Sequence, residues 1–130
     1  METRTVYRVE TRRGEGAFSC GVYFYGRHND DEFRAPWEEP RLQRRWDRGD
    51  LNDWVCGFQS LDEARRWFGP EEAEMLADEA SAQITTWTVP RRAVAYGRDQ
   101  VMFDRDLAHC TERRCVRDLY ADPEPPRLAA

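Results

Sequence analysis

Residues 60–90 read SLDEARRWFGPEEAEMLADEASAQITTWTVP and carry the strongest structural signals of the chain. Ser60, followed three residues later by Glu63, forms a capping box, which is typical of a helix N-terminus. Apolar residues at helical spacing follow until Gly69. We therefore predict a helix over 61–68.

A second helix is predicted over 70–80. Pro70 is compatible with a first helical turn, and the acidic residues after it suit the positive end of a helix. The run over 82–89 is rich in β-branched and aromatic residues and stops at Pro90, which predicts a strand. Two helices followed by strands indicate the α+β class.

Strands are predicted on both sides of this stretch. Residues 5–11 alternate apolar and polar side chains, residues 12–16 have turn chemistry, and residues 17–25 resemble a second strand. Further on, 93–96 and 100–103 flank a three-residue connection whose glycine is available for a positive φ, which predicts a hairpin. We expect one antiparallel sheet of about five strands with both helices packed on it.

The remaining segments are a loop, a short helix and a tail. Residues 26–53 contain many charges and isolated tryptophans, which predicts a long irregular loop with a short helix around 42–46. A last short helix is expected within 107–120. Residues 122–130 are rich in proline and are predicted to be a disordered tail. The 130-residue chain is then a single domain over 1–121.

Composition narrows the function classes. The 20 basic residues are all arginine and stand against 25 acidic ones, so the net charge is −5 and a nucleic-acid partner is disfavoured. We find no apolar run long enough for a membrane span or a signal segment, and we expect a cytoplasmic protein without membrane insertion. The four cysteines are expected to be free thiols, and no metal site is predicted.

Three separated motifs carry the candidate chemistry: Tyr7 and Arg8 in the first strand, Phe58 and Ser60 before the first helix, and Gln100 in a late strand. Their order resembles the ADP-ribosyltransferase superfamily. The resemblance implies an NAD-binding domain, with Arg8, Tyr7 and Phe58 near the cofactor and with Ser60 and Gln100 at catalytic positions. Gln100 stands where that family has a glutamate, and a neutral amide binds a ribose hydroxyl but does not stabilise a developing positive charge. Nucleotide binding is thus expected more than transfer of ADP-ribose to a protein.

Each of these motifs also has a structural explanation. Arg8 can pair with Glu10 on the same strand, Ser60 can serve only as a helix cap, and Gln100 can be an outward-facing strand residue. The sequence leaves both interpretations open.

The YRVE start, the CGF-x-S and WF motifs and the QV-x-F strand together look like small uncharacterised proteins of actinobacterial genomes and their phages. This similarity indicates an alternative function, a non-enzymatic acidic module that binds a basic surface of another protein, of the phage, host-interaction or anti-defence type. Trp37 and Trp46 in the 26–53 loop are the predicted anchors, because tryptophan is enriched among the residues that dominate binding energies.

Overall fold

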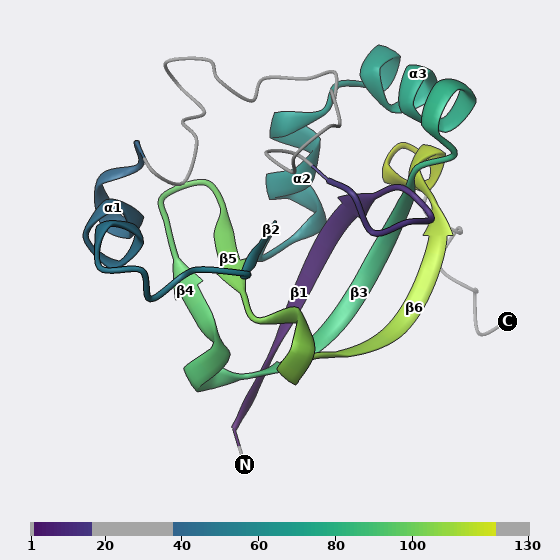
Figure 1. Cartoon of the computed structure of the whole chain (residues 1–130). Coiled ribbons are helices and arrows are strands. Elements are labelled where there is room, and N and C mark those ends of the chain that lie inside the picture. Colours follow the sequence, from purple (N-terminus) through teal and green to yellow (C-terminus); the bar gives the residue numbers. More distant parts are fainter. Residues whose placement is uncertain (1, 17–37, 122–130) are drawn as a thin grey trace, which may run out of the picture.

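The computed structural model describes residues 2–16 and 38–121, which form two three-stranded antiparallel sheets and three α-helices (Figure 1). The predicted α+β class is confirmed. The expectation of one sheet of about five strands was wrong, because the strands divide between two sheets. The predicted strand over 17–25, the predicted anchor Trp37 and the predicted tail lie outside the described residues.

The first sheet, called the long sheet here, has the order β1-β3-β6. It consists of β1 (Thr3–Glu10), β3 (Gln83–Pro90) and β6 (His109–Cys115). The first and third strands of the chain pair without interruption from Thr3 opposite Pro90 to Glu10 opposite Gln83. Residues from the two ends of the chain therefore form one sheet with β3 in its centre.

The expected helix within 107–120 was mostly wrong. Residues His109–Cys115 form β6, and only Val116–Leu119 forms a 3-10 turn. Pairing with β3, which includes a bulge beside Trp87, satisfies the backbone groups on one side of this segment. Such long-range pairing overrides the local pattern, as it often does for strands.

The second sheet, called the short sheet, has the order β2-β5-β4, with β2 (Val55–Gly57), β4 (Val94–Tyr96) and β5 (Val101–Phe103). The predicted hairpin is confirmed, since β4 and β5 are antiparallel neighbours. Gly97 in their connection does not have the expected positive φ; among the described glycines only Gly14 and Gly49 do. Glycine is required there because the neighbouring atoms leave no room for a side chain: a Cβ at this position would lie 2.9 Å from Leu42 Cδ1.

The helices begin where their capping residues indicate. α2 (Leu61–Trp67) starts after Ser60, whose Oγ accepts a 3.1 Å hydrogen bond from the Glu63 N–H. α3 (Pro70–Ala80) begins at its proline, as predicted. α1 (Pro40–Asp47) lies within the stretch predicted as a loop, close to the expected short helix, and it is capped by the Glu39 carboxylate.

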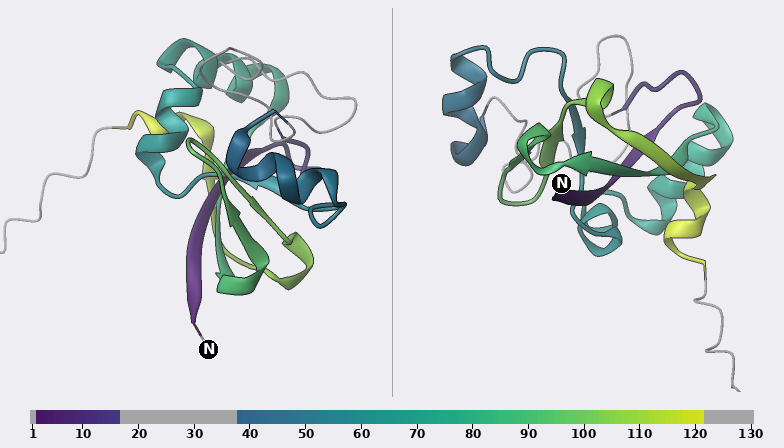
Figure 2. Two further views of the ribbon diagram at one scale, coloured as in Figure 1. Left: turned by 90° about the vertical axis from the view of Figure 1, so that its left-hand side faces the viewer. Right: turned by 90° about the horizontal axis from the view of Figure 1, so that it is seen from below.

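Three apolar clusters place these elements in layers (Figures 1 and 2). α2 and α3 cover one face of the long sheet, the short sheet packs against the other face, and α1 covers the far side of the short sheet. The corresponding core residues include Ile84 and Trp67 in the first cluster, Val6 and Phe103 in the second, and Leu42 and Met102 in the third.

Candidate functional site

The predicted site residues come from three chain segments that lie side by side. Tyr7 on β1 forms an antiparallel bridge with Phe58. The Tyr7 N–H donates to the Phe58 carbonyl at 2.9 Å, and the Phe58 N–H donates to the Tyr7 carbonyl at 2.6 Å. Phe58 directly follows Gly57, which pairs with Val101, the residue after Gln100. Tyr7, Phe58 and Gln100 therefore occupy neighbouring positions in space, although they lie far apart in the sequence.

Most of these side chains face the interior. Arg8 and Gln100 are each 2% exposed, and Phe58 is 5% exposed. The Phe58 ring packs against Trp67, with 5.8 Å between ring centroids, and Tyr7 packs against the same apolar cluster. Ser60 caps α2. Phe58 and Ser60 thus have structural roles in the folded chain.

The Arg8 guanidinium donates three hydrogen bonds to other residues of the chain. Nε donates to Glu10 Oε1 at 3.0 Å, Nη1 donates to the Cys56 carbonyl at 2.6 Å, and Nη2 donates to the Gly14 carbonyl at 3.0 Å. A Cβ at Gly16 would lie 2.7 Å from Arg8 Nη2, so the backbone closes tightly over the group. Burial lowers the pKa of Arg8, and the neighbouring Cys56 and Glu10 partly oppose that shift. The structure therefore shows the pairing with Glu10 that the sequence left open.

Glu10 is fully buried and is the centre of a cluster with three arginines. Besides Arg8, Arg105 donates to both carboxylate oxygens of Glu10 at 3.0 Å each, and Arg113 Nη1 lies 3.5 Å from Oε2. The Arg105 guanidinium also lies 4.7 Å from the centre of the Trp87 ring. This set, called the Glu10 cluster, has one negative and three positive charges, so its net charge is +2.

Sequence reasoning missed Arg105 and Arg113. The alternation within β1 places Arg8 and Glu10 on one face, which makes their pairing foreseeable. Arg105, however, is 95 residues from Glu10, and no local pattern connects them. Only the pairing of β6 with β3, which places Arg113 opposite Thr85, indicates the cluster.

The connection between β4 and β5 is fastened to α2 beside Gln100. The Trp67 indole N–H donates to the Asp99 carbonyl at 2.9 Å, and Arg66 forms a 3.5 Å ion pair with Asp99. Burial raises the pKa of Glu63 on the same helix, while the Gln59 N–H that binds its carboxylate and Arg66 partly oppose the shift. A hydrogen bond and an ion pair thus connect this turn to α2, and the Glu63 carboxyl group on that helix has a raised pKa.

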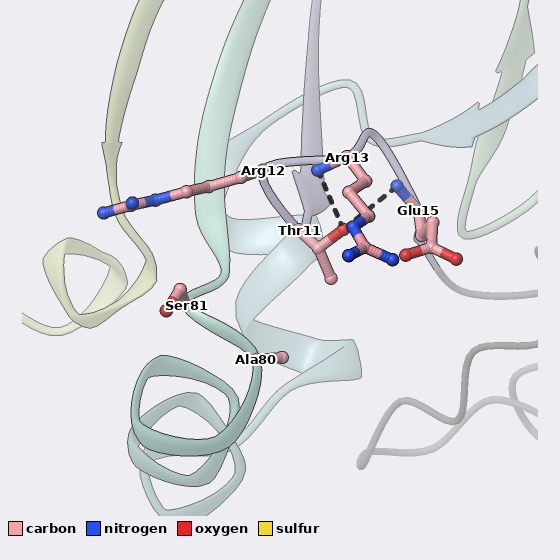
Figure 3. A pocket seen from close by; sticks show the side chains of 6 residues that line it. All are labelled: Thr11, Arg12, Arg13, Glu15, Ala80 and Ser81. Carbon is pink, nitrogen blue, oxygen red and sulfur yellow. Dashed lines mark hydrogen bonds between the residues drawn. The ribbon is translucent and has the colours of Figure 1, made fainter.

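A hollow of about 310 Å³ lies between the turn after β1 and the end of α3 (Figure 3). Its lining residues are Thr11, Arg12, Arg13, Glu15, Ala80 and Ser81. The Thr11 hydroxyl accepts hydrogen bonds from the N–H groups of Arg13 and Glu15, which fixes the turn. No predicted site residue lines this hollow.

α1 and the turn after it present a cationic and aromatic surface, called the α1 surface here: Arg41, Arg44, Arg45, Trp46 and Trp54. Arg41 and Arg44 are exposed and form no ion pair with a described residue. The Arg45 guanidinium lies 5.2 Å from the centre of the Trp54 ring. Trp46, a predicted anchor, is half-buried against the apolar cluster of Leu42, so only part of its ring faces solvent.

Residues 1–117 match the family model of the Bacteriophage T4 Y00F protein. The chain belongs to the bacteriophage T4 Y00F protein family. Membership in the Y00F family confirms the phage relationship that the sequence layout indicated, and it lends no support to the resemblance to ADP-ribosyltransferases. No curated protein and no solved structure matches the chain.

Two further findings concern only residues 2–16 and 38–121. No helix there is long and apolar enough to cross a membrane. The same residues contain no group of three or more His, Cys, Asp or Glu side chains placed to hold a metal ion.

Proposed function

We propose that this phage-related protein is a non-enzymatic binding module and that the α1 surface contacts its protein partner. The observation that carries the proposal is the pair of exposed guanidiniums, Arg41 and Arg44, which have no ion pair within the described chain. The next arginine of the helix, Arg45, lies over the ring of Trp54, and Trp54 and Trp46 are both partly buried against the Leu42 cluster. Arginine and tryptophan are the residue types most enriched among the dominant contacts of protein interfaces.

The positive charge of the α1 surface determines which charge its protein partner must carry. The chain as a whole carries −5, which favours a basic partner surface, but the segment 40–48 contains four arginines and one aspartate. A contact through the α1 surface therefore requires an acidic region on the partner, because complementary potentials speed association and fix orientation. Buried Leu42 anchors the backbone of α1 to the short sheet, so the helix does not have to become ordered on association.

Affinity capture from phage-infected host cells tests the proposal. The double variant Arg41→Glu/Arg44→Glu reverses the exposed charge of the α1 surface without altering a core residue. Its matched control, Arg91→Glu/Arg92→Glu, reverses two exposed charges after β3. A defined protein should be retained by the wild type and the control and lost by the α1 variant. Recovery of no specific protein, or equal recovery by all three, contradicts the proposal.

NAD binding stays a second candidate because one observation favours it: Tyr7, Phe58 and Gln100 occupy neighbouring positions. The burial of Arg8 against Glu10 weighs against it, since a dinucleotide must open that ion pair to reach the guanidinium. Calorimetry with NAD on the wild type and on Ser60→Ala tests it. Binding weakened by the substitution supports a site at the start of α2, and the absence of heat from the wild type removes the candidate.

A further inference from the structure

The free edge of the long sheet lies at β6. One side of this strand pairs with β3, and no described strand pairs with its other side. Five of the seven residues in His109–Cys115 are exposed, and β6 forms the border of the sheet opposite β1 (Figures 1 and 2). An edge strand of this length offers unpaired backbone N–H and C=O groups to an added strand.

A second observation shows which charge such a strand should carry. Arg113 points to the same face as Arg8, because both lie opposite Thr85 in the register of the long sheet. Its side chain is 44% exposed and makes no hydrogen bond to a described residue; its nearest carboxylate oxygen, on Glu10, is 3.5 Å away. Glu10 already accepts hydrogen bonds from Arg8 and Arg105, so its single negative charge is shared among three guanidiniums and the cluster keeps an excess of positive charge beside the exposed Arg113.

We propose that β6 accepts an extended segment of a partner protein as a fourth strand of the long sheet, with an aspartate or glutamate of that segment beside Arg113. Side chains directly opposite on neighbouring strands lie about 4.5–5.5 Å apart at Cβ, which is within reach of a charge-assisted hydrogen bond. The backbone of the edge provides affinity, and Arg113 provides selectivity for an acidic residue.

A second copy of the chain is a poorer occupant. In symmetric antiparallel registers of two β6 strands centred on Glu112, Arg113 or Arg114, that residue stands opposite its own copy. Like charges directly opposite each other destabilise a strand pair. This surface is also separate from the α1 surface, because α1 and β6 lie on opposite sides of the molecule (Figure 1).

Titration with a defined peptide tests the inference. The probe is a capped seven-residue peptide of alternating valine and threonine with one central glutamate, and the comparison peptide has glutamine in its place. Binding is followed by ¹H–¹⁵N NMR spectra of the labelled protein. We expect shifts of the β6 amides, and Arg113→Gln should weaken binding of the glutamate peptide about tenfold, as expected for loss of one charge-assisted hydrogen bond.

Arg114→Gln is the matched control, because Arg114 lies on the other face of β6 and is paired with Glu112 at 2.8 Å. It should leave the affinity unchanged, as should Arg41→Glu/Arg44→Glu, which separates this inference from the proposed function. A probe N-methylated along its backbone should not bind. The inference is overturned by absence of binding to the wild type, by equal weakening in both glutamine variants, by binding of the N-methylated probe, or by a dimer through β6 in sedimentation experiments.

Discussion

Replacement of Glu10 by glutamine should destabilise the fold strongly. The variant keeps the size of the side chain but removes the only negative charge of the Glu10 cluster, so that three guanidiniums face one another. It also puts an amide N–H₂ where a carboxylate oxygen accepts from an arginine, which orphans buried donors. Removing one partner of a buried ion pair costs about 3–5 kcal/mol. Total stabilities are about 5–15 kcal/mol, so this loss is a large fraction of the stability of the domain.

Urea unfolding followed by tryptophan fluorescence and thermal unfolding by calorimetry measure the effect. For a domain of this size each kcal/mol shifts Tm by about 3–5 °C, so Glu10→Gln should lower Tm by about 10–25 °C. Asp50→Asn is the control, because it removes the exposed Arg48–Asp50 pair, and such pairs contribute about 0–1 kcal/mol. If Glu10→Gln and Asp50→Asn differ by less than about 1 kcal/mol, the buried charge of Glu10 is not a major source of stability.

Two further predictions concern substitutions of single residues, Glu63 and Gly97. Because burial raises the pKa of Glu63, the folded state binds that proton more tightly than the unfolded state, and the stability contributed by Glu63 is present at low pH and decreases as pH rises above about 4.5. Glu63→Gln should remove this part of the pH dependence of Tm between pH 4 and 7, and a profile identical to that of the wild type would contradict the assignment. Gly97→Ala should cost about 1–3 kcal/mol, because its Cβ would lie 2.9 Å from Leu42 Cδ1 and 3.0 Å from the Gln100 carbonyl oxygen. Gly69→Ala should cost less, since its Cβ meets the movable end of Glu72, and the reverse order in urea unfolding would refute this reasoning.

The helices were predictable because their signals are local. Ser60 and Glu63 cap α2 within one turn, and Pro70 begins α3 at its expected position. The division of the strands into two sheets was not predictable, because it depends on the partners that each strand finds. β6 shows the difference most clearly: its sequence, HCTERRC, has little strand character, and its pairing with β3 decides its conformation.

The predicted site also depends on contacts between distant parts of the chain, which local sequence signals do not reveal. The sequence analysis assigned Tyr7, Phe58 and Gln100 to one site, and the structure places them at neighbouring positions. It could not indicate that Arg8 and Gln100 are almost completely buried, since polar residues in a strand are usually assigned to its solvent face. The burial of Arg8 depends on Glu10, whose other partners come from the far end of the chain.

The cost of breaking the buried Arg8–Glu10 ion pair distinguishes NAD binding from protein binding as the proposed function. A dinucleotide phosphate that takes Arg8 from Glu10 must first overcome a loss of about 3–5 kcal/mol, which corresponds to a dissociation constant weakened by about 150- to 5000-fold. Arg41 and Arg44 present their charges to solvent without an ion pair to a described residue, and Arg113, 44% exposed, makes no hydrogen bond to a described residue; an acidic partner therefore reaches these arginines without breaking a hydrogen-bonded buried pair. The same arginine-rich composition therefore has two consequences in one fold. Arg8, buried in the Glu10 cluster, links β1 to β2, and the exposed arginines remain available for recognition of another protein.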